Sequence, residues 1–130
     1  ILGNHAHVIE PMEKRTITLD DGTEKEVFVV YAQGNFISAQ VKEHTRSTII
    51  LDMNITKKGE TGKISIDSVD YVSLYCYDRG KGVQNRYVLL DIRQEMQDFE
   101  DGKGNISQSL YNTLKLELQN TEKVLGEPIK

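Results

Sequence analysis

The sequence has 130 residues, of which 38% are hydrophobic and 28% charged, and its formal net charge is −4. This length suits one domain at most, and the acidic balance excludes the basic stripe of a nucleic-acid interface. No apolar run approaches the roughly 20 residues that span a bilayer. We therefore expect neither a nucleic-acid partner nor a membrane segment.

The first part of the chain predicts β-structure. Residues 1–3 are typical of the last step of a strand, and a loop with two histidines follows. Residues 13–19 and 25–32 predict two strands around Asp20-Asp21-Gly22-Thr23, because Asp-Gly between strands is a strong hairpin signal. The second strand leads to Gly34, a residue type that permits backbone turns which other residues resist.

Three longer segments predict a further sheet. Residues 46–56 alternate in polarity, which is typical of a half-buried strand, and one face carries Ile49, Leu51, Met53 and Ile55. Residues 63–77 predict a long strand, with a parity shift near Asp67 and Ser68 that indicates a bulge or bend. Residues 85–92 predict another strand.

The pattern becomes helical after Ile92. Residues 93–100 predict a short helix, which the segment 101–105 breaks. Ser107 is a favourable N-cap for a second helix, and one face of that helix carries Leu110, Leu114, Leu118 and Leu125. Gly126 is expected to end the helix before Pro128. The predicted fold class is therefore α+β, a mostly antiparallel β-sheet followed by C-terminal helices.

Three features of the central segment have structural interpretations. The single cysteine, Cys76, excludes an internal disulfide, and we expect it to be a small buried hydrophobe. We expect His44 to be a solvated loop histidine. Tyr71, Tyr75 and Tyr77 share strand parity, and we expect them to pack against the helices rather than to form a binding face.

Two histidines one residue apart, His5 and His7, are the most informative feature of the sequence. They lie in Gly3-Asn4-His5-Ala6-His7-Val8. Imidazoles at this spacing can turn toward one point, which is a usual way to present two nitrogen ligands to a transition metal. The alternative is a pair of exposed loop histidines without a partner. If they are ligands, most of the other ligands must come from residues outside this sequence.

A second segment gives the histidine pair a family context. After the predicted hairpin comes Tyr31-Ala32-Gln33-Gly34-Asn35-Phe36. Together the two segments resemble the C-terminal half of the CapA family, the poly-gamma-glutamate capsule biosynthesis proteins. The family pattern is Gly-x-His-Pro-His-Val, a hairpin, then Tyr-Ser-Leu-Gly-Asn-Phe. Ala6 departs from it, as do Ala32 and Gln33, so substrate preference stays open, whereas the His-x-His and Gly-Asn-Phe cores are intact.

The resemblance implies a calcineurin-type metallophosphoesterase fold, and this chain would form half of its β-sandwich. We expect one C-terminal fragment of a larger domain, β-rich over 1–92 and helical over 93–130. In that fold a late His-x-His segment supplies ligands to a two-metal centre. The resemblance therefore implies that His5 and His7 are metal ligands in the full-length parent protein, which would bind Mn, Zn or Fe. We expect the site to be empty in the fragment alone.

Three further residues are candidates for roles at such a site. Asn35 can hydrogen-bond near the metals, although a simple turn residue is the alternative. Arg46 and Arg79 can meet an anionic polymer or a phosphorylated substrate, although exposed surface arginines are the commoner outcome. A different placement reads Asn4 and His5 as the earlier Gly-Asn-His segment of metallophosphoesterases, but the acidic residue usual after that histidine is missing.

The sequence thus predicts the C-terminal part of a CapA-like protein of bacterial capsule biosynthesis. The parent would be extracytoplasmic, at the cell surface or membrane-anchored, and a candidate metal-dependent hydrolase. The missing N-terminal half would be its first partner, and the isolated fragment would be inactive. The alternative is a non-catalytic β-rich binding or assembly module that self-associates through exposed sheet edges and apolar faces.

Overall fold

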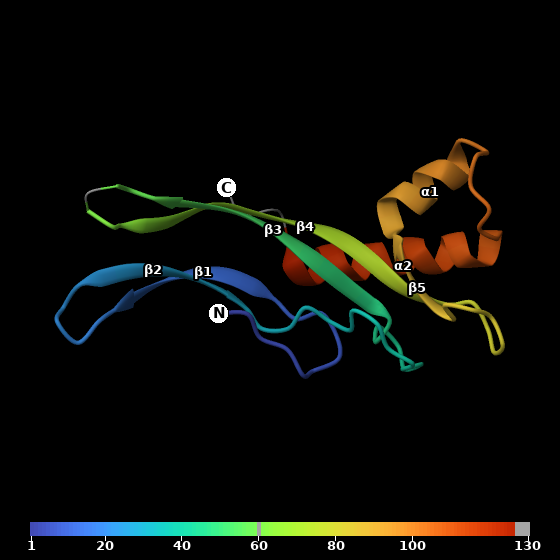
Figure 1. Ribbon diagram of the computed structural model, residues 1–130, viewed down its shortest axis with the longest axis horizontal. Coiled ribbons are helices and arrows are strands. Elements are labelled where there is room, and N and C mark those ends of the chain that lie inside the picture. Colours follow the sequence, from blue (N-terminus) through green and yellow to red (C-terminus); the bar gives the residue numbers. More distant parts are fainter. Residues whose placement is uncertain (60, 127–130) are drawn as a thin grey trace.

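A computed structural model describes residues 1–59 and 61–126 of the chain. It has two antiparallel sheets followed by two helices (Figure 1). The strands of the first sheet are β1 (Met12–Thr18) and β2 (Glu24–Val30). The second sheet has the order β3 (Ser47–Lys57), β4 (Ile64–Asp78) and β5 (Tyr87–Asp91). The helices are α1 (Ile92–Glu100) and α2 (Gln108–Leu125), so the predicted α+β class is confirmed.

The β1–β2 hairpin forms where the Asp-Gly signal predicts it. The amide of Thr23 donates to Oδ1 of Asp21 at 2.9 Å, and Gly22 takes a φ of 80°. The hydrogen bonds from Thr23 favour the charged carboxylate and lower the pKa of Asp21. In Figure 1 this hairpin lies alongside the hairpin of β3 and β4.

Residues 1–3 add a short pairing to the end of β2. The amide of Gly3 donates to the carbonyl of Val30 at 2.8 Å, and the amide of Val30 donates to the carbonyl of Ile1 at 3.0 Å. Leu2 and Val30 form a parallel bridge. Residues 1–3 therefore form an isolated bridge rather than the predicted end of a strand, and this pairing fixes the start of the histidine loop.

A bulge divides the long β3–β4 hairpin. Asn54 pairs with Ser68 and Ile55 with Ile66, so Asp67 is the extra residue. The Ser65 hydroxyl donates to Asp67 Oδ1 at 2.8 Å, and hydrogen bonds from Thr56 and Ser65 lower the pKa of Asp67. The bulge predicted near Asp67 is confirmed, and Ile55 beyond it is 59% exposed, which the simple alternation did not predict.

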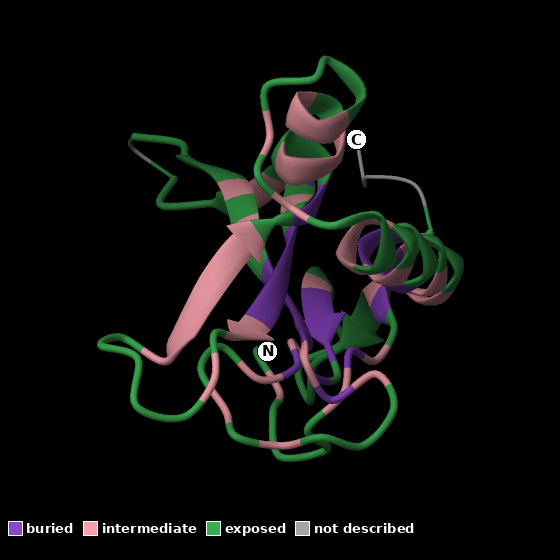
Figure 2. Cartoon of the chain, turned by 90° about the vertical axis from the view of Figure 1, so that its right-hand side faces the viewer, coloured by how far each residue is buried: buried purple, intermediate pink, exposed green. Residues whose placement is uncertain are grey.

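Two apolar clusters form the core. The first lies between the sheets and the end of α2, and its most buried members include Phe28, Val30, Ile49, Val69 and Leu125. The second joins β4 to both helices through Tyr75, Ile92, Leu114 and Leu118. Figure 2 shows the buried residues gathered on the strands and on the inner side of the helices.

Capping explains the limits of α2. The Ser107 hydroxyl oxygen accepts from the amide of Leu110 at 3.1 Å, and Gly126 takes a φ of 71° at the other end. Both caps are confirmed, whereas Pro128 lies outside the described residues. The leucines predicted to share one face are the ones that α2 turns toward the sheet, since Leu114, Leu118 and Leu125 are buried.

The central tyrosines and the cysteine also follow expectation. Tyr71 packs on the first cluster, which includes Leu125 of α2, while Tyr75 and Tyr77 pack on the second, which includes both helices. Burial raises the pKa of the Tyr75 hydroxyl. Cys76 is 1% exposed. These side chains therefore serve the core rather than an open face.

The expectation that His44 is a solvated loop histidine is wrong. Its side chain is 31% exposed, and its Nδ1 lies 3.1 Å from Oε2 of Glu117, a buried residue of α2. The Ser47 hydroxyl donates to the same carboxylate oxygen at 2.6 Å. A buried carboxylate needs such partners, and they join the start of β3 to α2. Sequence reasoning missed the pair because 73 residues separate its members.

Within the described ranges, neither helix has the length and hydropathy needed to cross a membrane.

Stability is expected to depend on the second cluster. Leu114 is fully buried, so Leu114→Ala should lower the free energy of unfolding by about 2–5 kcal/mol through lost burial and a cavity. Leu116→Ala removes the same atoms from a side chain of α2 that is 56% exposed and should cost much less. Urea denaturation followed by circular dichroism measures both. Equal losses would contradict the packing described for α2.

Candidate metal centre

The histidine loop is tied at both ends to the segment that follows β2. Gly3 lies so close to Tyr31 that a Cβ atom on it would be 2.1 Å from the Tyr31 carbonyl oxygen. At the other end Ile9 forms an antiparallel bridge with Gln33, and the amide of Glu10 donates to the carbonyl of Ala32 at 3.0 Å. The loop 4–8 is therefore held beside the Gly-Asn-Phe segment.

Both histidines of the pair have an unusual backbone. The φ of His5 is 94° and that of His7 is 63°, a region that residues with a side chain rarely adopt. The side chain of Asn4 accepts from the amide of His5 at 2.9 Å. Such strain persists where the surrounding structure imposes it, often at binding sites. Here the imposing structure is the pairing at both ends of the loop.

The rings of the pair are close enough to act together. Their centroids are 6.0 Å apart, with an angle of 44° between the planes. From a metal–nitrogen bond of about 2 Å, two imidazoles on one tetrahedral ion have centroids about 5 Å apart. The observed separation is about 1 Å longer than that value, and both side chains are exposed. The spacing and chemistry of the pair are therefore compatible with two nitrogen donors of one divalent metal ion.

The donor set is incomplete within this chain. In residues 1–59 and 61–126, no group of three or more His, Cys, Asp or Glu side chains is placed to hold a metal ion. Two nitrogens leave a tetrahedral or octahedral ion mostly without ligands. The histidine pair could therefore supply only part of the ligand set of a metal ion.

Asn35 connects His7 to the rest of the fold. Its Oδ1 lies 2.8 Å from Nδ1 of His7. Its Nδ2 donates to the carbonyl of His7 at 3.1 Å and to the carbonyl of Thr45 at 2.8 Å. The predicted neighbourhood of Asn35 and the histidine pair is present in the structure. Thr45 was missed, because a backbone carbonyl leaves no signal in the residue type.

Gly34 brings Asn35 to this position. A Cβ atom at Gly34 would lie 2.2 Å from the Ser47 carbonyl oxygen, and the φ of Gly34 is 80°. Gly34 also forms an antiparallel bridge with Thr48, whose hydroxyl donates to the carbonyl of Gln33 at 2.8 Å. The Gly-Asn-Phe segment thus packs on the start of β3 through backbone contact that only glycine permits.

Neither candidate arginine bonds a histidine of the pair within the described residues. Arg46 is half-buried, and its Nε donates to the carbonyl of Gln40 at 3.1 Å. Arg79 is exposed, with Nη1 3.5 Å from the carbonyl of Gln84. The structure therefore does not assemble the arginines and the histidines into one complete substrate site.

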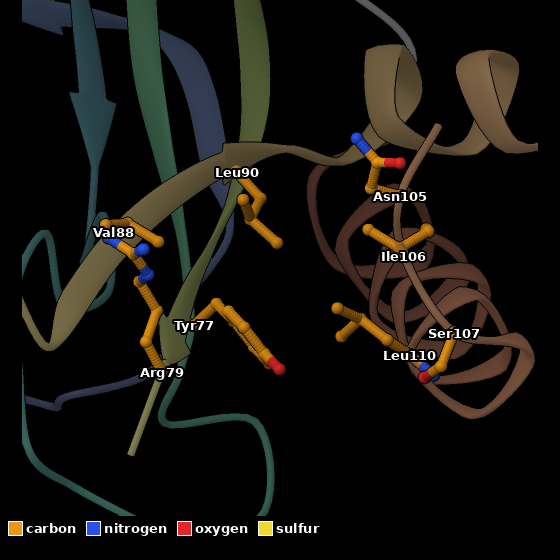
Figure 3. A pocket seen from close by; sticks show the side chains of 8 residues that line it. All are labelled: Tyr77, Arg79, Val88, Leu90, Asn105, Ile106, Ser107 and Leu110. Carbon is orange, nitrogen blue, oxygen red and sulfur yellow. The ribbon is translucent and has the colours of Figure 1, made fainter. Parts of the chain in front are cut away.

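Arg79 borders a pocket of about 360 Å³ between β4, β5 and the start of α2. Figure 3 shows the Tyr77 side chain directed across it toward Leu110 and Ser107. Apolar side chains form much of its lining. The pocket therefore lies on the second core cluster, and it does not include the histidine loop.

The loop that carries Arg79 is closed by an ion pair. Arg86 donates to both carboxylate oxygens of Asp78, each at 2.7 Å, and the amide of Gly80 donates to Oδ1 at 2.9 Å. These bonds favour the charged carboxylate and hold the pKa of Asp78 well below its usual range. The arrangement fixes the β4–β5 turn, in which Arg79 and Lys81 are both exposed.

Comparison with known proteins identifies no relative of the chain. No family model, no curated protein and no solved structure matches the chain. The resemblance of the two motif segments to CapA proteins accordingly stays a prediction.

Gly34→Ala is expected to damage the fold more than its φ alone explains. Gly22 has the same φ of 80°, but nothing lies within 4 Å of a Cβ placed there. Gly22→Ala should therefore cost about 1–2 kcal/mol of stability, the usual cost of left-handed backbone. Gly34→Ala adds a clash with the Ser47 carbonyl and should cost clearly more. Urea denaturation of both variants measures the difference, and equal costs would contradict the close approach.

Arg86→Gln should raise the pKa of Asp78 toward its ordinary value. Because the folded-state pKa is lowered, the stabilisation is present above the unfolded value of about 4 and is lost as pH falls toward the folded one. A carbon-detected NMR titration of the Asp78 carboxyl measures the shift. Arg79→Gln is the matched control, because Arg79 bonds Gln84 instead. An unchanged Asp78 titration in Arg86→Gln would contradict the ion pair.

Proposed function

We propose that this chain is the C-terminal part of a CapA-like protein of metallophosphoesterase type, in which His5 and His7 are ligands of a divalent-metal site. The parent acts in the synthesis, export or anchoring of a bacterial capsule polymer such as poly-gamma-glutamate. Its location is extracytoplasmic, at the cell surface or membrane-anchored. The remaining metal ligands come from residues outside this sequence, the N-terminal half of the same protein.

One observation carries the proposal, namely the hydrogen bond between His7 and Asn35. The two residues lie in the two segments that resemble the CapA pattern, and 28 positions separate them in the chain. The resemblance alone requires only that both segments exist, in order. Their side chains also meet, at 2.8 Å, where a second residue is needed to orient a metal-binding imidazole. This contact supports a shared site.

The chemistry proposed for the parent is hydrolysis assisted by two metal ions. When bound, Mn, Zn or Fe ions at such a site supply a water of lowered pKa and neutralise charge on the oxygens of the reacting group. In the full-length parent, His5 and His7 would hold the metal, and Asn35 would orient His7. The isolated chain, with its partial donor set, is metal-free and inactive.

The substrate of the parent is anionic, either a carboxylate polymer or a phosphorylated compound. Arg79 supports this choice, because its guanidinium is exposed and bonds only weakly to Gln84, at 3.5 Å. Arg46 is a weaker candidate, since it is half-buried and its Nε is engaged by Gln40. We propose that Arg79 meets the anion at the surface, at a distance from the metal ligands.

The metal content of the full-length protein tests the proposal. The double variant His5→Ala with His7→Ala should lose at least one metal ion per chain, measured by inductively coupled plasma mass spectrometry. His44→Gln is the matched control, because His44 bonds Glu117 of α2 and should leave metal content unchanged. Unchanged metal content in the double variant would contradict the metal role of the pair.

A second candidate function is a non-catalytic assembly module that binds a second copy of itself. Ile50 and Val72 pair directly across β3 and β4, and they are 46% and 40% exposed on the outward face. In the part of the chain that the structure describes, no strand pairs with the outer edge of β5. Open edges and exposed apolar pairs favour association with an identical chain.

Size-exclusion chromatography with light scattering tests this second candidate. We expect a dimer or a larger species, and Ile50→Lys with Val72→Lys should shift it toward monomer. Ile17→Lys, at a β1 position that is 38% exposed, is the control and should leave the mass unchanged. If the unmodified chain is monomeric and binds little hydrophobic dye, the assembly-module function would be contradicted.

A further inference from the structure

We infer that Asn35 is a positioning residue that holds the His7 imidazole with its hydrogen on Nδ1, so that Nε2 is the nitrogen available to a metal. This inference rests on the proposed metal role of the pair. It adds to that role which atom of His7 binds and which residue selects the atom. Three contacts of one side-chain amide carry it.

The orientation of the Asn35 amide follows from its two carbonyl neighbours. Nδ2 lies 3.1 Å from the carbonyl oxygen of His7 and 2.8 Å from that of Thr45. A carbonyl oxygen only accepts hydrogen bonds, so the group that faces two of them must be the NH₂ group, which has two hydrogens. The flipped amide would place an oxygen against two oxygens. The amide orientation is therefore fixed by its partners and not only by assignment.

The tautomer of His7 follows from the amide. With NH₂ turned to the carbonyls, Oδ1 faces Nδ1 of His7 at 2.8 Å. Oδ1 has no hydrogen to donate, so Nδ1 must carry one. In a neutral imidazole the other nitrogen, Nε2, then keeps its lone pair. Metal-bound histidines usually donate their second ring N–H in this way, which fixes the tautomer and the direction of the ring.

Asn35 is itself held on both sides. Thr45 is 5% exposed and precedes β3, so its carbonyl is a rigid acceptor, and its own hydroxyl donates to the carbonyl of Lys42 at 2.7 Å. On the other side Gly34 fixes the backbone against Ser47. Through its bonds to Thr45 and to His7, Asn35 thus fixes the exposed His7 ring relative to the start of β3. His5 lacks a comparable bond to its ring from any described side chain.

Long-range ¹H–¹⁵N correlation NMR of the ¹⁵N-labelled chain tests the inference directly. For a neutral imidazole, the pattern of couplings identifies which ring nitrogen carries the hydrogen. We expect the Nδ1–H form for His7. A free neutral imidazole prefers the Nε2–H form, so His5 serves as the internal control. An Nε2–H pattern for His7 in the unmodified chain would overturn the inference, and this reading needs no variant.

A matched pair of asparagine variants tests the cause. Asn35→Ala should return His7 to the Nε2–H form and should lower metal affinity of the full-length protein about 10- to 100-fold, the usual effect of losing such a partner. Asn54→Ala removes an exposed asparagine of β3 whose Nδ2 donates to the Ser68 hydroxyl at 2.8 Å, outside the histidine loop, and it should change neither reading. An unchanged His7 tautomer in Asn35→Ala would overturn the role of Asn35.

The two proposals fail in distinguishable ways. If His7 has the Nε2–H form while the double histidine variant still loses metal, the positioning role is wrong and the metal role stands. If His7 has the Nδ1–H form while the double variant keeps all its metal, the metal role is wrong. In that second case Asn35 only fixes the loop that carries His7, and it has no role in metal binding.

Discussion

The close contact between residues 34–35 and the start of β3 is the constraint on which the candidate site depends. Gly34 takes a conformation with φ of 80° and approaches Ser47 where a Cβ atom would lie 2.2 Å from a carbonyl oxygen. This approach places the Asn35 amide between the Thr45 carbonyl and the histidine loop. Without it, His7 would be an exposed loop residue with no fixed direction. The same backbone contact also joins the end of the first sheet region to the second sheet.

Much of the fold was predictable because its signals are local. Asp21 and Gly22 specify a hairpin turn, Ser107 and Gly126 cap a helix, and the parity shift at Asp67 marks a real bulge. Each of these depends on residues within a few positions of one another. What the sequence could not supply was long-range geometry. The bonds of His44 and Ser47 to Glu117 link residues about 70 positions apart. Residue type alone gives no sign of them.

The candidate site was predictable in part. The motif segments predicted that His5, His7 and Asn35 belong together, and His7 and Asn35 do meet. Neither the left-handed backbone of the histidines nor the Thr45 carbonyl has a signature in residue type. The first goes with the pairing of the loop ends, and the second depends on the approach of Gly34 to the start of β3. The two arginines show the opposite limit. Their charge suggested an anion site, but charge does not determine where a side chain lies. In the described residues each arginine bonds a backbone carbonyl and neither bonds a histidine of the pair.

The central claim is that His5 and His7 complete a metal site whose other ligands lie elsewhere in the protein. The most direct measurement is the sequence of the coding DNA upstream of Ile1. We predict Asp-x-His and Gly-Asp type segments there, since a two-metal centre needs carboxylate and imidazole ligands beyond this pair. A start codon close to Ile1, with no such segments between, would contradict the claim and leave the two histidines as loop residues.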